Sequence, residues 1–139
     1  MPAKDLYHDN VKNALIKEGW QITHDPLTIQ FSETDFLYVD LAAEKIIAAE
    51  KEGEKIAVEV KSFSNDSPMY DFHLALGQFL NYRMTLEEIE SDRVLYLAVP
   101  LDTYQSFFQR ALPKAAVQRH QLKLIVYRIK KEEIAKWIN

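Results

Sequence analysis

Regular alternation of apolar and polar residues marks the extended segments in the first half of the chain. Residues 20–23 and 27–31 alternate on either side of a break at His24-Asp25-Pro26, and residues 55–61 alternate strictly and are rich in β-branched side chains. The pattern predicts two short strands and, after them, a meander of three strands near residues 36–41, 44–50 and 55–61.

Apolar residues recur at helical spacing in other parts of the chain. Residues 5–18 form an amphipathic pattern that stops at Gly19, and a longer one begins near Pro68 and runs to about Ser91. A continuous apolar run over residues 94–99 is typical of a strand covered on both faces. The C-terminal pattern predicts helical turns near 102–110 and 113–120, a strand at 123–127 and a short helix at 130–138.

This order of elements predicts an α/β fold, more specifically an α+β arrangement with a central mixed β-sheet flanked by helices. With 139 residues and 47% hydrophobic content, the chain is expected to form a single domain, residues 1–139. No apolar run reaches the roughly 18 residues that a spanning helix needs, and a secretory signal is missing. We therefore expect a cytoplasmic protein without a membrane partner.

Composition excludes several classes of enzyme. The chain has no cysteine, which excludes disulfides, thiolate nucleophiles and cysteine-rich metal sites. Its three glycines form no phosphate-binding cluster, and its four histidines form no His-x-x-x-His pair. Nucleotide hydrolysis by a glycine-rich loop and zinc peptidase chemistry are therefore excluded.

Charge is distributed unevenly along the chain. Residues 1–100 carry nine Lys and Arg against eighteen Asp and Glu, a net of −9, whereas residues 101–139 carry eight against three, a net of +5. The basic segment is compatible with contact to DNA, with docking to an acidic partner, or with docking to the acidic region of a second copy in a homodimer. The candidate phosphate contacts are Arg110, Lys114, Arg119, Lys123, Arg128, Lys130 and Lys131.

The candidate chemistry begins with Asp40, a carboxylate in the apolar run over residues 36–41 with no charged residue within three positions. Such a group needs a metal ion or a counter-charge if it points inward. Glu59 and Lys61 stand two apart in an alternating strand and so share one face, while the apolar residues between and before them line the other. If Asp40 lies on the adjacent strand, its oxygens converge with those of Glu59.

Two carboxylates, with water and a substrate phosphate, make a suitable octahedral site for Mg²⁺ or Mn²⁺, so Asp40 and Glu59 are candidate metal ligands. Lys61 would orient or help to deprotonate the attacking water, or stabilise charge on the pentavalent phosphate. The ordinary alternative is that Glu59 and Lys61 decorate the wet face of a strand and that Asp40 caps a turn.

Gln78 and Tyr82 lie four residues apart in the predicted long helix and therefore share a face. An amide and a phenol at these positions could hold a water molecule, a carboxylate or a DNA phosphate. The alternative is a polar flank beside the apolar stripe of the helix, and the pattern alone is compatible with both.

Together these residues resemble the motif of the PD-(D/E)xK nucleases, which have a restriction-endonuclease-like fold. Asp40, Glu59-x-Lys61 and Gln78-x-x-x-Tyr82 are similar to the acid, acid, lysine, glutamine and tyrosine series of the resolvase-like and RecB-like branches. The resemblance implies a restriction-endonuclease-like core and a Mg²⁺-dependent or Mn²⁺-dependent endodeoxyribonuclease that hydrolyses phosphodiesters.

Over nearly its whole length the chain also resembles the XisH family of cyanobacterial excision controlling factors. The resemblance rests on segments that include Lys4-Asp5-Leu6-Tyr7-His8, Val39-Asp40-Leu41-Ala42-Ala43-Glu44-Lys45, Ala57-Val58-Glu59-Val60-Lys61-Ser62-Phe63 and Leu95-Tyr96-Leu97-Ala98-Val99-Pro100. It implies an accessory protein for removal of the fdxN element from DNA during heterocyst differentiation, acting beside a site-specific recombinase and an XisI-like companion protein.

The resemblance also adds His8 to the candidate site. Resolvase-like nucleases usually place a glutamate on the first helix, facing the metal, and His8 occupies the comparable distance from Gly19. Its neutral imidazole could ligate or relay a proton, or the residue could sit on the helix flank. Two functional hypotheses follow: a metal-dependent nuclease acting on DNA, and a catalytically silent regulator that binds a companion protein or the recombinase.

Overall fold

A computed structural model of the protein describes residues 4–45 and 53–139. The elements follow one another in the order α1 (His8–Lys17), β1 (Gln21–His24), β2 (Leu27–Gln30), β3 (Phe36–Val39), β4 (Leu41–Lys45), β5 (Glu54–Val60), α2 (Pro68–Ile89), β6 (Arg93–Pro100), α3 (Leu101–Gln105), η1 (Phe107–Gln109), α4 (Ala111–His120), β7 (Leu124–Arg128) and β8 (Glu133–Ile138). Among these residues, no helix is both long enough and apolar enough to cross a membrane.

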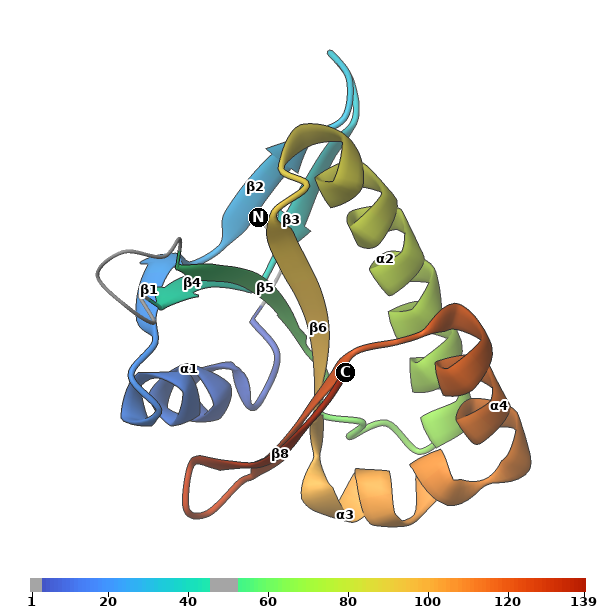
Figure 1. Cartoon of the computed structure of the whole chain (residues 1–139). Helices are drawn as coiled ribbons and strands as arrows, with labels where there is room; N and C mark the ends of the chain where they lie inside the picture. Colours follow the sequence, from blue (N-terminus) through green and yellow to red (C-terminus); the bar gives the residue numbers. More distant parts are fainter. Residues whose placement is uncertain (1–3, 46–52) are drawn as a thin grey trace.

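A mixed sheet of six strands forms the centre of the molecule (Figure 1). Its strand order is β1-β4-β5-β6-β7-β8, while β2 and β3 form a separate two-stranded sheet. The β5–β6 and β6–β7 pairs are parallel, and the flanking pairs are antiparallel. The predicted central mixed sheet flanked by helices is therefore confirmed.

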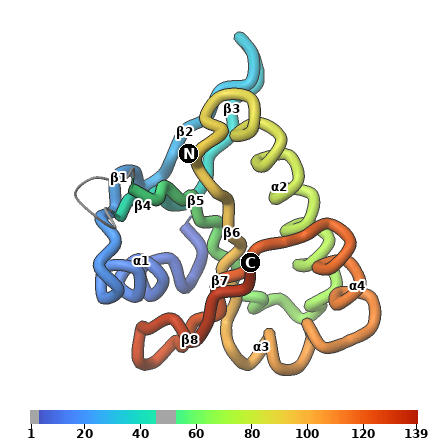
Figure 2. The backbone as a smooth tube through the Cα atoms, viewed as in Figure 1, coloured from blue at the N-terminus to red at the C-terminus, as the bar shows by residue number. Residues whose placement is uncertain are grey.

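Helices α1 and α2 lie on opposite sides of this sheet (Figure 2). The alternation within β5 divides its side chains between them: Ala57 belongs to the apolar cluster under α2, whereas Ile56 and Val58 pack with Val11 and Leu15 of α1. Each face therefore has its own core, and the odd-numbered side chains of β5 point toward α2.

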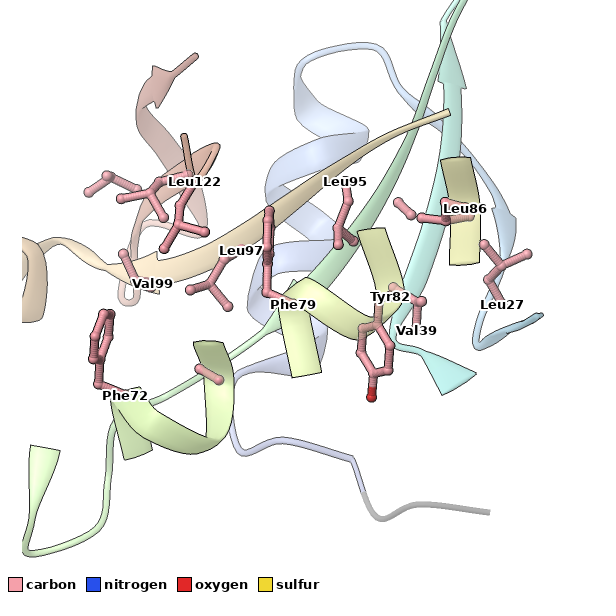
Figure 3. Packing of buried hydrophobic residues seen from close by; sticks show 14 of the residues in the cluster. Leu27, Val39, Phe72, Phe79, Tyr82, Leu86, Leu95, Leu97, Val99 and Leu122 are labelled. Atoms are coloured by element: carbon pink, nitrogen blue, oxygen red, sulfur yellow. The ribbon is translucent and has the colours of Figure 1, made fainter. Parts of the chain in front are cut away.

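The core under α2 contains the aromatic and aliphatic stripe predicted for the long helix (Figure 3). Phe72 and Phe79 are fully buried there against Leu97 and Val99 of β6. The Ser67 side chain accepts a hydrogen bond from the Tyr70 N–H, and Pro68 occupies the first turn, so this helix begins where the sequence predicts.

The predicted single strand over residues 36–41 is wrong, because the chain breaks at Asp40. β3 ends at Val39 and pairs with β2, whereas β4 begins at Leu41 and pairs with both β1 and β5. The predicted meander is wrong for the same reason. The predicted strand over 44–50 lies largely outside the described residues: β4 is described as Leu41–Lys45, and residues 46–50 are not described.

The predicted C-terminal helix over residues 130–138 is wrong as well. Residues Glu133–Ile138 form β8, which pairs antiparallel with β7. Trp137 packs on Trp20 and Tyr96, with ring centroids 5.8 Å and 5.1 Å away. The helix formers in this segment are overridden because the edge of β7 needs a partner for its backbone groups and the aromatic contacts favour the extended form.

Candidate active site

Asp40 lies at the junction where the chain leaves one sheet and enters the other. Its own N–H donates to Oε1 of Glu59 over 3.3 Å, and its Oδ2 accepts the N–H of Val60 over 2.7 Å. The Glu59 side chain thus accepts from the Asp40 backbone, and the Asp40 side chain accepts from the residue after Glu59, which places both carboxyl groups at the C-terminal end of β5. The predicted convergence of Asp40 and Glu59 is observed.

The environment of Glu59 disfavours a negative charge. The residue is only 5% exposed, and burial, together with the neighbouring Asp40 charge, raises the pKa of Glu59 from 4.5 to about 8. Burial likewise raises the pKa of Asp40, although the Val60 N–H and the charges of His8 and Lys61 oppose this shift. Two adjacent acids with raised pKa values in one site are typical of metal centres and catalytic centres.

Lys61 supplies the positive charge closest to Glu59, with Nζ 3.5 Å from Oε2. Its backbone is held from two neighbouring strands: its N–H donates to the Ala98 carbonyl over 3.0 Å, and its carbonyl accepts the Tyr127 hydroxyl over 3.2 Å. The side chain is 19% exposed, so the ammonium group lies at the boundary between the carboxylates and solvent. A cavity of about 170 Å³ lies on the side of Lys61 away from the acid pair, and its lining includes Lys61, Asp5 and Asp71 but neither Asp40 nor Glu59.

Helix α2 brings Tyr82 to the same site. Its ring belongs to the core beside Val39, and Figure 3 shows its hydroxyl oxygen pointing away from the labelled apolar side chains. Burial first, and then the charges of Glu59 and Asp40, raise the pKa of Tyr82 well above its usual range. The phenol is therefore protonated at neutral pH and has a hydrogen to donate.

Gln78 lies one helical turn before Tyr82, and its Oε1 is buried without a hydrogen-bond partner. A buried acceptor of this kind costs about 1–3 kcal/mol if nothing occupies it. The unpartnered oxygen therefore indicates a place for a hydrogen-bond donor, such as a water molecule, on the face of the sheet that α2 covers.

His8 is 3% exposed and does not lie on an exposed helix flank. Its Nε2 lies 2.7 Å from Oδ1 of Asp25, while its Nδ1 is buried without a partner. A positive charge on His8 would favour the charged form of Asp40 and so oppose the rise in its pKa. Within the described residues, the buried side-chain nitrogen and oxygen atoms that lack partners are those of His8 and Gln78, both predicted from the sequence.

These observations test whether a divalent cation fits. The hard carboxylate oxygens of Asp40 and Glu59 match Mg²⁺ and Mn²⁺, and a bound cation would favour the charged forms that burial disfavours. In the parts of the chain that the structure describes, no group of three or more His, Asp or Glu side chains is gathered to hold a metal ion. The residues therefore fit a cation held by two carboxylates, with the remaining ligands from water or substrate.

Sequence reasoning missed Asp25, Lys12 and Tyr127. Asp25 precedes Pro26 at a break between strands, where an acidic residue has an ordinary explanation as a turn former. Lys12 donates to Oδ2 of Asp25 over 2.8 Å, a pairing between α1 and the β1–β2 turn that no local pattern indicates. The helical spacing of His8 and Lys12, four residues apart, was the available signal that they share a face.

Fold and site define a mixed-sheet α/β protein with an acid pair and a lysine at the C-terminal end of a central strand. A family model described as XisH protein matches residues 1–135, and the chain belongs to the XisH family. No curated protein matches it.

Two crystal structures are closely similar to the chain over its length. An XisH family protein from Nostoc punctiforme PCC 73102 is 51% identical, with a TM-score of 0.86, and the match covers 97% of this chain and 100% of that one. An fdxN element excision controlling factor protein from Anabaena variabilis is 51% identical, with a TM-score of 0.87, over 98% and 100% of the two chains.

Proposed function

We propose that this protein is a divalent-metal-dependent phosphodiesterase of the PD-(D/E)xK type that acts on DNA during the excision of a DNA element. The observation that carries the proposal is the acid pair itself: Glu59 is buried against Asp40, and Lys61 lies 3.5 Å from the same glutamate. Burying two carboxylates with a single positive charge nearby costs free energy of folding. A site that binds a cation and a phosphate would explain why the protein keeps this arrangement.

Each residue has a distinct part in this proposal. Asp40 and Glu59 would hold Mg²⁺ or Mn²⁺, which when bound polarises the phosphodiester and lowers the pKa of bound water. Lys61 donates hydrogen bonds to the attacking water or to the phosphate oxygens, at the boundary with solvent. Tyr82 donates from the helix, and Gln78 accepts through Oε1, so the two together orient a water molecule or a phosphate beside the acids.

The link to DNA excision is taken from the Anabaena variabilis protein, which is described as an fdxN element excision controlling factor. Extending that role to this chain, the expected partners are DNA, a site-specific recombinase and an XisI-like companion protein. The basic residues of the C-terminal part, including exposed Lys130 and Lys131 on the turn between β7 and β8, are the proposed DNA phosphate contacts.

Cleavage assays with three proteins test the proposal. Supercoiled, single-stranded and branched DNA are incubated with Mg²⁺ or Mn²⁺ and with the wild type, Glu59→Gln or Glu88→Gln. Glutamine keeps the shape of Glu59 and an oxygen for the Asp40 N–H but cannot supply a carboxylate, while Glu88 is exposed on α2 and serves as the matched control. We expect metal-dependent cleavage by the wild type and by Glu88→Gln, and none by Glu59→Gln. Equal cleavage by all three, or no cleavage of any substrate, would overturn the proposal.

A second candidate function is a catalytically silent regulator that binds a companion protein or the recombinase. The small size of the chain and the net charge of −9 over residues 1–100, which disfavours a surface that binds DNA along its whole length, favour it. Size-exclusion chromatography with an XisI-like protein distinguishes the two. A complex that forms equally with wild type and Glu59→Gln, together with no DNA cleavage, supports the regulator.

A further inference from the structure

The two ring nitrogens of His8 have opposite surroundings. Nε2 lies 2.7 Å from Oδ1 of Asp25, a distance typical of a strong, charge-assisted hydrogen bond, whereas Nδ1 is buried and unpartnered. An ionised carboxylate can only accept hydrogen bonds, so Nε2 carries the hydrogen. In a neutral imidazole, Nδ1 is then left as a bare acceptor.

Asp25 is held in its place from two elements. It follows β1, whose last residue, His24, is paired with Ala42 on β4, so the register brings Asp25 toward the start of β4 beside Asp40. Lys12, one helical turn after His8, donates to the other oxygen of Asp25 over 2.8 Å. Although burial opposes ionisation, the hydrogen bonds from Lys12 and His8 hold the pKa of Asp25 below its ordinary value, so this carboxylate is charged at neutral pH.

His8 reaches the region of the acid pair through Asp25, because its ring contacts Asp25 and the register of β1 brings that residue toward the start of β4, directly after Asp40. Its helix is tied to the same region through Asp5, whose Oδ2 accepts the N–H of Ser62 immediately after Lys61. A buried, unpartnered nitrogen is therefore held in the part of the molecule that contains the two acids and the lysine, where an attacking water molecule would need a group to accept its hydrogen.

We propose that Asp25, anchored by Lys12, is a positioning residue that holds the hydrogen of His8 on Nε2 and leaves Nδ1 free to accept a hydrogen bond from the water molecule at the Asp40–Glu59 site. The inference rests on the proposed phosphodiesterase function for the role of that water. It goes beyond the roles considered above, because it assigns the accepting nitrogen of His8 and identifies Asp25 as the carboxylate that fixes the tautomer. The same logic governs the aspartate of the serine protease triad, where an asparagine imposes the wrong tautomer.

The principal test is the His8 tautomer, read by nitrogen-15 NMR of the ring in the metal-free protein. We expect the wild type to carry its hydrogen on Nε2. In Asp25→Asn, the amide group can donate to Nε2, which shifts the hydrogen to Nδ1. The matched control is Asp9→Asn, next to His8 in sequence but with its side chain 70% exposed and 3.6 Å from Lys4, and it should keep the wild-type tautomer.

The rate of DNA cleavage provides a second test of the positioning role. We expect Asp25→Asn to lose about 10–100-fold in the rate of DNA cleavage, as outer-shell partners of histidine do, while Asp9→Asn stays at the wild-type rate. Lys12→Met keeps the carboxylate and should lose less than Asp25→Asn, with the wild-type tautomer retained.

The two proposals fail in distinguishable ways. If the wild-type His8 carries its hydrogen on Nδ1, or if Asp25→Asn cleaves like the wild type, the positioning role is wrong even though the nuclease proposal stands. If the wild type cleaves no DNA but His8 has the expected tautomer and Asp25→Asn reverses it, the phosphodiesterase function fails and the positioning of His8 by Asp25 is retained. The wild-type spectrum needs no variant, so a variant that does not fold leaves the test decisive.

Discussion

Two clusters of buried charge lie at opposite ends of β5, and they are built differently. At the N-terminal end, Arg93 is 6% exposed and its guanidinium reaches three partners: the Ile56 carbonyl over 2.9 Å, Glu90 over 2.8 Å and Glu44 over 3.5 Å. One cation thus meets two carboxylates that remain partly exposed to solvent. Its donors are directed at partners in geometry typical of a structural ion pair.

At the C-terminal end, one cation again faces two carboxylates, but these carboxylates are withdrawn from solvent: the Glu59 side chain is only 6% exposed. The pKa values of Glu59 and Asp40 are both raised, and His8 and Gln78 each have a buried side-chain atom without a partner. The contrast shows how to separate structural from functional burial of charge within one small protein. A satisfied cluster stabilises the fold, whereas an incomplete one indicates a position kept for something that binds.

Removing the satisfied cluster should have the largest effect on folding. Arg93→Met fills similar space but leaves the Ile56 carbonyl without its donor and Glu44 and Glu90 without their cation. We expect the free energy of unfolding to fall by about 3 kcal/mol, as when one partner of a buried ion pair is removed. Urea denaturation measures it. At temperatures where the variant stays folded, it should cleave DNA at the wild-type rate. If the folded variant lost cleavage, the Arg93 cluster would not be purely structural, and the contrast between the two clusters would be wrong.

The incomplete cluster should behave in the opposite way. Folding raises the pKa of Glu59 from 4.5 to about 8. Between these pH values Glu59 is protonated in the folded state and ionised in the unfolded state. Stability therefore falls as pH rises through this window, and the full penalty is present above about pH 8. Glu59→Gln cannot ionise and should be more stable than the wild type near pH 9 by a few kcal/mol, since one pKa unit corresponds to about 1.4 kcal/mol.

The control for that prediction is the same pair of proteins near pH 5, where Glu59 is protonated when folded and the difference should be small. Denaturant midpoints measured across the range give the comparison. A difference in stability that does not change with pH would mean that Glu59 is not held in its neutral form. Added Mg²⁺ or Mn²⁺ should stabilise the wild type and not Glu59→Gln, because only the wild type offers the second carboxylate.

The smallest effect is expected at the helix side of the site. Tyr82→Phe removes one hydroxyl that points away from the core and leaves the ring packing unchanged. One hydrogen bond of about 1 kcal/mol corresponds to a decrease of about fivefold in cleavage rate, with little change in the free energy of unfolding. Tyr70→Phe, on an exposed part of the same helix, is the matched control. A loss as large as that of Glu59→Gln would assign Tyr82 a more direct part in the chemistry.

Much of the fold follows from periodicity. The long helix, the apolar strand β6 and the alternating strand β5 were predictable, because each carries a pattern longer than a single turn or pleat. The C-terminal strand β8 was not, since Lys130 to Lys136 is rich in helix formers and its extended form depends on β7 and on the contacts of Trp137. Long-range pairing of this kind leaves no local signal.

The residues of the candidate site likewise divide into those that local periodicity predicts and those that depend on long-range contacts. Glu59 and Lys61 were predictable as neighbours from the period of a strand, and Gln78 and Tyr82 from that of a helix. The break of the chain at Asp40 was not, because the apolar run around it continues without a turn residue. The role of Asp25 could not be predicted either, since its partners Lys12 and His8 lie on a different element, α1.

The place of Asp40 between two sheets has a consequence for how this family can vary in length. β3 and β4 belong to different sheets, and each has its register set by its own partner strand. One inserted or deleted residue between Phe36 and Lys45 would turn the carboxylate away from Glu59, since neighbouring side chains on a strand alternate in direction. The exposed hairpin tip closed by the Phe31 N–H and the Asp35 carbonyl can grow or shrink at little cost. Relatives should therefore differ in length at that tip and keep a constant spacing on both sides of the acid.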